Sequence, residues 1–261
     1  MKRLIYSGIR IDDFGRYVYD EVHNLPTDII DLVEPQLFES NVNNNTYWFG
    51  YNFNSNCDKG DRSKFINYIK GIGDNCISEE ELEKFMTKPL KSLNTAVNLY
   101  HIDAFIYPLS QRSELVTKMV STINKYTSRE MARLSFELVK RVPTDIEFDW
   151  DMYESEVVYE NDNQYNQIHN YVENDLLPKI HALDYFSLAH DVKPKYRKYI
   201  KNYLQFKDSD IEKISKLQNG FNVLIVDDIN TTGSTLQEIL RQISILNPNC
   251  NIYIYTLIGK P

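Results

Sequence analysis

Apolar positions along the chain follow two periods, one typical of buried strands and the other typical of helices. Short apolar runs, which predict buried strands, occur at 47–53, 102–107, 222–226 and 251–258. A helical face is marked by Leu115, Met119, Val120 and Ile123. A second such face, made by Leu236, Ile239, Leu240 and Ile243, lies between the last two runs. This order predicts a parallel strand–helix–strand unit close to residue 261.

Helix boundaries are predicted from capping residues and prolines. Ser78 and Glu81 have the spacing of a capping box, which predicts a helix from Glu79. We expect Pro89 to break this helix and a second one to continue to about Leu99. The segment 57–62 is expected to be a turn.

The middle of the chain alternates between apolar and polar residues. The alternation at 134–138 and 146–152, with Pro143 between the two segments, predicts a β-hairpin. One face of its second strand would carry Asp145, Glu147, Asp149 and Asp151. That acidic face is either solvated or a docking surface for a basic partner. Further on, residues 164–183 are expected to be helical, and Ser209 is expected to cap a short helix that Gly220 ends.

These elements predict an α/β protein with a parallel sheet flanked by helices. Residues 100–261 would form the core, with a long insert at about 140–210. Residues 1–99 would form an N-terminal extension that packs over the carboxyl edge of the sheet.

Composition and charge narrow the functional class. The net charge of −8 argues against broad nucleic-acid binding. No apolar run is long enough to span a membrane and no secretory signal is visible, so we expect a cytoplasmic protein. The three cysteines, Cys57, Cys76 and Cys250, lack the spacing of a zinc site or a disulfide framework, and no resident metal site is expected.

The stretch 223–235 combines residues that suit a phosphorylated sugar. A predicted buried strand ends in Asp227 and Asp228, at the edge where parallel sheets bind ligands. A loop of small polar residues then leads into a helix N-terminus, where free N–H groups and the helix dipole favour a phosphate. Acidic side chains beside a phosphate cradle suit sugar hydroxyls or a metal. We expect both carboxylates to lie in solvent, so that folding hardly needs their charge.

This stretch resembles the 5-phosphoribosyl 1-pyrophosphate (PRPP) motif of type I phosphoribosyltransferases, a hydrophobic strand followed by Asp-Asp and Thr-Thr-Gly-x-Thr. The resemblance implies the type I fold and assigns the ribose 2- and 3-hydroxyls to Asp227 and Asp228. The residues expected to wrap the 5-phosphate are Thr231, Thr232, Gly233, Ser234 and Thr235.

The family also has a pyrophosphate loop after an earlier strand. The segment 108–114 has the expected place, and Arg112 would bind pyrophosphate with help from Ser110 and Gln111. Its Pro-Leu-x-x-Arg pattern is similar to the ComF-like branch. The N-terminal zinc-binding cysteines of that branch are missing here.

A mobile flap over the reacting centre is the third family element. One candidate is the turn near 141–145. The other is the basic segment 190–201, in which Lys193, Lys195 and Arg197 would neutralise pyrophosphate. A solvated amphipathic helix is the alternative explanation of the basic segment.

The resemblance implies transfer of a 5-phosphoribosyl group from PRPP to a nitrogenous acceptor, with Mg²⁺ carried mainly by PRPP. Asp227, Asp228 and Arg112 would be the catalytic residues. Either residues 1–99 or the insert would supply the hood over the acceptor, and a homodimer is compatible with the sequence. The alternative is a PRPP-binding regulatory module that does not catalyse the transfer, because fold alone does not decide between the two.

Overall fold

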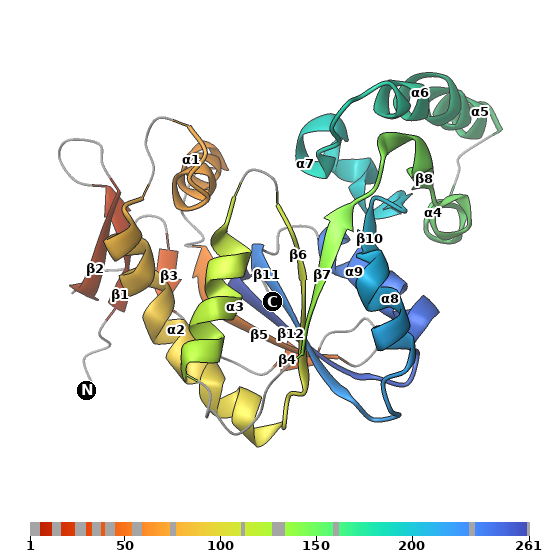
Figure 1. Ribbon diagram of the computed structural model, residues 1–261. Coiled ribbons are helices and arrows are strands. Elements are labelled where there is room, and N and C mark those ends of the chain that lie inside the picture. Colours follow the sequence, from red (N-terminus) through yellow and green to blue (C-terminus); the bar gives the residue numbers. More distant parts are fainter. Residues whose placement is uncertain are drawn as a thin grey trace. The chain divides into compact units, whose positions relative to one another are not determined.

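The structure is a computed structural model that describes residues 6–11, 17–23, 30–32, 38–39, 45–53, 59–73, 77–110, 113–126, 134–158, 162–229 and 233–259 (Figure 1). Its contacts divide the chain into two units. The first contains Met1–Phe136, Gln218–Thr231 and Asn249–Pro261, and the second contains Glu137–Leu217 and Thr232–Pro248. No described helix is both long and apolar enough to cross a membrane.

The first unit is built on a mixed sheet whose central strands are parallel. Its parallel strands, in spatial order, are β6 (Ala104–Pro108), β11 (Asn222–Ile229), β12 (Asn251–Gly259) and β5 (Thr46–Phe53). Antiparallel strands continue beyond β5 as β3 (Ile30–Leu32), β1 (Tyr6–Ile11) and β2 (Tyr17–His23), and β4 (Phe38–Glu39) also pairs with β5. The predicted α/β class and the four predicted apolar strands are confirmed.

Two long helices cover one face of this sheet (Figure 1). They are α2 (Glu79–Leu99) and α3 (Leu115–Tyr126), which pack against each other and against β5, β6 and β11. The predicted apolar face of α3 is confirmed, because Leu115, Met119, Val120 and Ile123 are all buried. A third helix, α1 (Lys59–Ile69), begins inside the segment 57–62 that was predicted to be a turn. The turn prediction is therefore wrong for residues 59–62.

Helix α2 begins as predicted but does not break at Pro89. Ser78 caps it by accepting the Glu81 N–H at 3.2 Å, and the Ser78 hydroxyl donates to the Glu81 carboxylate at 2.9 Å. Pro89 lies inside the continuous helix, so the Phe85 carbonyl lacks its usual N–H donor. The Tyr51 hydroxyl of β5 donates to that carbonyl at 2.7 Å. The neighbouring sheet therefore supplies the hydrogen bond that the proline removes, and the predicted break is wrong.

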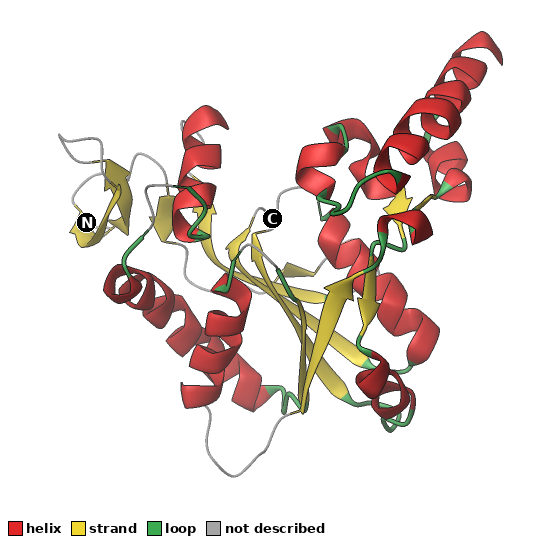
Figure 2. Ribbon diagram, turned by 45° about the horizontal axis from the view of Figure 1, so that its top comes forward, coloured by secondary structure: helices red, strands yellow, loops and turns green. Residues whose placement is uncertain are grey.

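The second unit is mostly helical (Figure 2). It holds α4 (Trp150–Glu156), α5 (Asp162–Tyr171), the π-helical segment Val172–Leu176, α6 (Leu177–His181), α7 (Leu188–Asp191), α8 (Asp208–Ser215) and α9 (Ser234–Leu246), with 3₁₀ turns at Pro143–Asp145 and Pro194–Tyr199. The predicted helices at 164–183 and 236–243 are confirmed. The helix near Ser209 is also confirmed, but its capping is not: α8 follows Lys207 without a side-chain cap, and Ser209 lies in the first turn.

The hairpin predicted over 134–152 is wrong. Strand β7 (Leu134–Lys140), which runs from the first unit into the second, pairs there with β10 (Leu204–Phe206). The second predicted strand shrinks to β8 (Glu147–Phe148), which pairs with β9 (Ile200–Lys201). Asp149 then accepts the Met152 N–H at 3.0 Å and starts α4. The four acidic residues therefore do not share one strand face.

Candidate functional site

Two adjacent carboxylates end the central strand β11 of the first unit. Asp227 is 5% exposed and Asp228 is 7% exposed, so the expectation that both lie in solvent is wrong. Both acids lie near the carboxyl end of β11, just before its last residue, Ile229. The neighbouring strands β6 and β12 run parallel to β11. Because charged groups are buried only with partners, the surroundings of each acid define what it can do.

The two acids lie on opposite faces of the sheet, because side chains alternate along a strand. Leu224 and Val226 belong to the core that α2 and α3 cover, and Asp228 continues that face. Asp227 lies on the other face, and its carboxylate accepts the backbone N–H of Asp228 at 2.9 Å. The pair thus presents one carboxylate to each side of the strand end.

Asp228 forms an ion pair with Lys70, whose ammonium lies 2.7 Å from its Oδ2. Burial lowers the pKa of Lys70, but the Asp228 charge, the hydrogen bond to Asp228 and the Asp227 charge together outweigh it and leave that pKa raised. Lys70 is therefore an ammonium ion at neutral pH. Lys70 was not among the predicted site residues, because no local pattern links it to a strand so far along the chain.

The backbone of Lys70 is fixed by the way α1 ends. Gly71 adopts a left-handed conformation with φ of 67°, its N–H bonds the Tyr68 carbonyl at 3.3 Å, and the Ile72 N–H bonds the Asn67 carbonyl at 2.9 Å. This hydrogen-bond pattern is a Schellman motif in which Lys70 is the C-cap, directly after the last helical residue, Ile69. Its neighbours Tyr68 and Ile69 are buried, so only the side chain of Lys70 is free to reorient.

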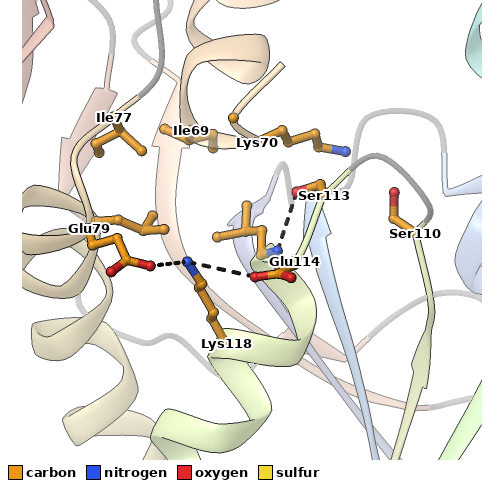
Figure 3. A pocket seen from close by; sticks show the side chains of 11 residues that line it. Ile69, Lys70, Ile77, Glu79, Ser110, Ser113, Glu114 and Lys118 are labelled. Atoms are coloured by element: carbon orange, nitrogen blue, oxygen red, sulfur yellow. Dashed lines mark hydrogen bonds and ion pairs between the residues drawn. The ribbon is translucent and has the colours of Figure 1, made fainter. Parts of the chain in front are cut away.

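A pocket of about 430 Å³ lies beside Lys70 in the first unit (Figure 3). Its polar lining residues are Lys70, Glu79, Ser110, Ser113, Glu114 and Lys118. Ile69, Leu82 and Leu115 contribute apolar wall. The pocket therefore lies where α1 ends and where α2 and α3 begin, beside the loop that follows β6.

The second lysine of the pocket is held by acids of both helices. Lys118 lies 2.9 Å from Glu79 of α2 and 4.0 Å from Glu114, the residue before α3 (Figure 3). The Ser113 hydroxyl accepts the Leu115 N–H at 3.3 Å, near the start of α3. Lys70 and Lys118 thus differ in kind: Lys118 pairs with acids of the pocket wall, whereas Lys70 pairs with the strand-end acid Asp228.

The structure describes only part of the predicted pyrophosphate loop. Ser110 lines the pocket, and its assignment to pyrophosphate stays a prediction. Gln111 and Arg112 lie outside the described residues, so their assignment to pyrophosphate stays a prediction.

The predicted phosphate loop leads into α9. Thr231 and Thr232 lie outside the described residues. Gly233 precedes the helix with φ of 73°, a left-handed conformation that glycine adopts without strain. Ser234 is buried, and its carbonyl accepts the Tyr203 hydroxyl at 2.9 Å, while Thr235 continues the first turn. Gly233 brings no side-chain cap to α9, and helix N-termini favour the binding of a phosphate.

The basic segment proposed as a flap forms a packed part of the second unit. Arg197 donates to the carbonyls of Val192 at 2.9 Å and Ala189 at 2.5 Å. The Lys193 ammonium lies 4.9 Å from the centroid of the Tyr171 ring, and that of Lys195 lies 4.6 Å from the Tyr196 ring. The structure thus gives Arg197 a backbone-bracing role here. The other candidate, at 141–145, contains a 3₁₀ turn.

No protein-family model and no curated protein matches the chain. Among solved structures, the chain is similar to a hypoxanthine phosphoribosyltransferase from Staphylococcus aureus, with a TM-score of 0.34 and 14% identity over 69% of this chain and 65% of that protein. The chain therefore spans less than two thirds of the length of the staphylococcal protein. An adenine phosphoribosyltransferase from Leishmania donovani is similar with a TM-score of 0.32 and 9% identity, over 74% of this chain and 73% of that protein.

Proposed function

We propose that this chain is a phosphoribosyltransferase, which transfers a 5-phosphoribosyl group from PRPP to a nitrogenous acceptor and releases pyrophosphate. The observation that carries the proposal is the buried carboxylate pair, Asp227 and Asp228, at the end of the central parallel strand. In sequence this pair is followed by a Thr-Thr-Gly-Ser-Thr loop and a helix that begins at Ser234. Open α/β sheets bind their ligands at such strand ends.

The two acids suit a ribose diol better than a phosphate. Carboxylates accept hydrogen bonds from hydroxyls and repel phosphate oxygens. We assign the ribose 2- and 3-hydroxyls to Asp227 and Asp228. We assign the 5-phosphate to the 231–235 loop, where Gly233 and the first N–H groups of α9 offer donors that need no positively charged side chain.

The pocket beside Lys70 is our candidate for the pyrophosphate. It offers the ammonium groups of Lys70 and Lys118 and the hydroxyls of Ser110 and Ser113. Helices α2 and α3 also begin there, and helix N-termini favour anions. Arg112 follows in the same loop as Ser110, and its planar guanidinium suits bidentate binding of a phosphate.

These assignments account for catalysis by positioning and electrostatics. The bond at ribose C1 breaks with development of an oxocarbenium-like ring and negative charge on the leaving pyrophosphate. Cationic groups at the pyrophosphate end stabilise that negative charge most strongly in the transition state. The two carboxylates hold the ribose diol in place and so align C1 with the acceptor. Magnesium enters with PRPP as part of the substrate, since Mg²⁺ binds phosphate oxygens while keeping several waters.

The acceptor would lie under a hood supplied by residues 1–99. Support comes from Lys70, which places the end of α1 at Asp228 and so brings part of this region to the carboxyl edge of the sheet. The insert at 140–210 is the other candidate for the hood.

The test is pyrophosphate release from PRPP and Mg²⁺ in the presence of a panel of purine, pyrimidine and pyridine bases. We expect release with one class of base and no release without a base. Binding of PRPP without release for any base would instead identify a non-catalytic PRPP-binding module.

A further inference from the structure

We propose that Lys70 determines specificity, by making the site prefer a pyrophosphorylated ribose over ribose 5-phosphate. This inference rests on the function proposed above, because it takes Asp228 as a ligand of the ribose hydroxyls. It adds a residue from α1, outside both of the motifs that suggested the function. Lys70 lines the pocket, and its ammonium is bonded to Asp228 at 2.7 Å.

Lys70 competes for the carboxylate that the ribose needs. Its side chain is 25% exposed, and that of Asp228 is 10% exposed, so the pair is largely removed from water. In that setting a charge-assisted hydrogen bond to Asp228 is stronger than one from a neutral hydroxyl. A ligand that offers only a ribose diol must therefore share Asp228 with the Lys70 ammonium.

A pyrophosphate gives Lys70 a second anionic partner. Figure 3 shows the Lys70 side chain extending towards the part of the pocket that Ser110 and Ser113 line. The Schellman motif holds the Lys70 backbone in place, while the four-carbon stem of lysine allows the ammonium to move between partners. With pyrophosphate in the pocket, Lys70 can bridge to it or turn to it, and the Asp228 carboxylate becomes available to the ribose.

Lys118 does not offer the same exchange. Its ammonium is paired with Glu79 at 2.9 Å and lies 4.0 Å from Glu114, so its partners are not ribose ligands. Removing Lys118 would weaken the attraction for any anion in the pocket without changing Asp228. Lys70 is thus the described cation that links the pyrophosphate pocket to the ribose site. Discrimination between PRPP and a ribose that lacks pyrophosphate, such as the nucleotide product, is expected to depend on it.

The experiment compares two ligands, PRPP with Mg²⁺ and ribose 5-phosphate, by calorimetric titration of the full chain. In Lys70→Met, which keeps the apolar stem, we expect PRPP affinity to fall roughly tenfold or more, the scale of a lost charged hydrogen bond. Ribose 5-phosphate affinity should stay unchanged or rise, because Asp228 is released. Lys70→Arg should keep part of the preference for PRPP. Lys84→Met, which removes an exposed lysine paired with Glu80 on α2, is the matched control and should leave both affinities unchanged.

Each other outcome is decisive. Equal weakening of both ligands in Lys70→Met, with the unfolding temperature of the parent, would overturn the proposal and leave Lys70 as a residue that only orients Asp228. If Lys70→Met does not fold, Lys70→Arg decides: a smaller preference for PRPP than in the parent supports the proposal, and an unchanged preference overturns it. A parent that binds PRPP no better than ribose 5-phosphate would overturn this inference and leave the proposed function standing. A parent that binds neither ligand would overturn both.

Discussion

Lys70 and Asp228, which lie far apart in the sequence, form an ion pair of 2.7 Å at the end of the central strand. Removing one member leaves the other largely buried without its partner. We expect Asp228→Asn to lower the free energy of unfolding by about 2 kcal/mol, less than the ~3–5 kcal/mol of fully buried pairs. Lys70→Met combined with Asp228→Asn should cost less than the sum of the single changes, by about 1 kcal/mol. Urea unfolding of the four proteins measures this coupling, and strict additivity would show that the pair contributes no stability.

The pH dependence of this stability follows from the raised pKa of Lys70. A lysine whose pKa is raised on folding contributes stability that is fully present below the unfolded value of 10.5 and is lost as the pH rises through the folded value. The difference in unfolding free energy between the parent and Lys70→Met should therefore be constant from neutral pH to 10.5 and shrink above it. A difference that already shrinks near neutral pH would contradict a protonated Lys70.

The glycine before α9 can be tested against a glycine with similar geometry. Gly233 and Gly220 have φ of 73° and 79°, so alanine at either position should cost about 1 kcal/mol of stability through backbone strain. Only Gly233→Ala should weaken ribose 5-phosphate binding, because Gly220 precedes β11 at the opposite end of that strand from the acids. If Gly233→Ala and Gly220→Ala bind ribose 5-phosphate with equal affinity, Gly233 is not part of the phosphate-binding loop.

Arg112→Ala tests the pyrophosphate loop. We expect pyrophosphate release to fall about 10²-fold, the scale of losing one transition-state contact, with a smaller loss of PRPP affinity. Arg62→Ala, a change on α1 outside the motif, is a control for general loss of positive charge. Release that survives Arg112→Ala unchanged would remove this loop from the site.

The packing of α2 on the sheet yields a prediction independent of function. Tyr51→Phe removes the hydroxyl that donates to the Phe85 carbonyl, a hydrogen bond that Pro89 cannot replace, and should cost about 2 kcal/mol. Tyr100→Phe removes a hydroxyl from a half-buried ring that packs on Trp48 and Tyr253, and should cost less. Equal losses in thermal or urea unfolding would show that the Tyr51 hydrogen bond does not compensate for Pro89.

The parts of the fold that the sequence predicts well are those with one dominant period. The apolar runs of β6, β11 and β12 and the face of α3 have no competing interpretation, and each is where the pattern indicates. Residues 146–152 alternate between apolar and polar positions as a strand would. Asp149 is also a residue type favoured at helix N-caps, and in the structure it caps α4 by accepting the Met152 N–H. Pro89 lies inside α2, where Tyr51 of a distant strand donates to the Phe85 carbonyl, and no local pattern reveals this hydrogen bond.

The residues of the candidate site also fall into those that a local sequence pattern predicts and those that it does not. Asp227, Asp228 and Gly233 belong to one contiguous motif, and their strand-end and helix-start positions were predictable. Lys70 was not, because its role depends on an ion pair with an acid that lies much later in the chain. The burial of the two acids was also missed, since the sequence does not reveal what covers a strand end.

The most direct test of PRPP binding at Asp227 and Asp228 is calorimetric titration of PRPP and Mg²⁺ into the parent chain and into Asp227→Asn with Asp228→Asn. Circular dichroism shows whether the variant keeps its fold. We predict saturable binding by the parent and, in the folded variant, a loss of affinity of roughly a hundredfold or more, as for several lost charged hydrogen bonds. Parent-like binding by the folded variant, or no binding by the parent, would contradict the assignment of these carboxylates to the ribose.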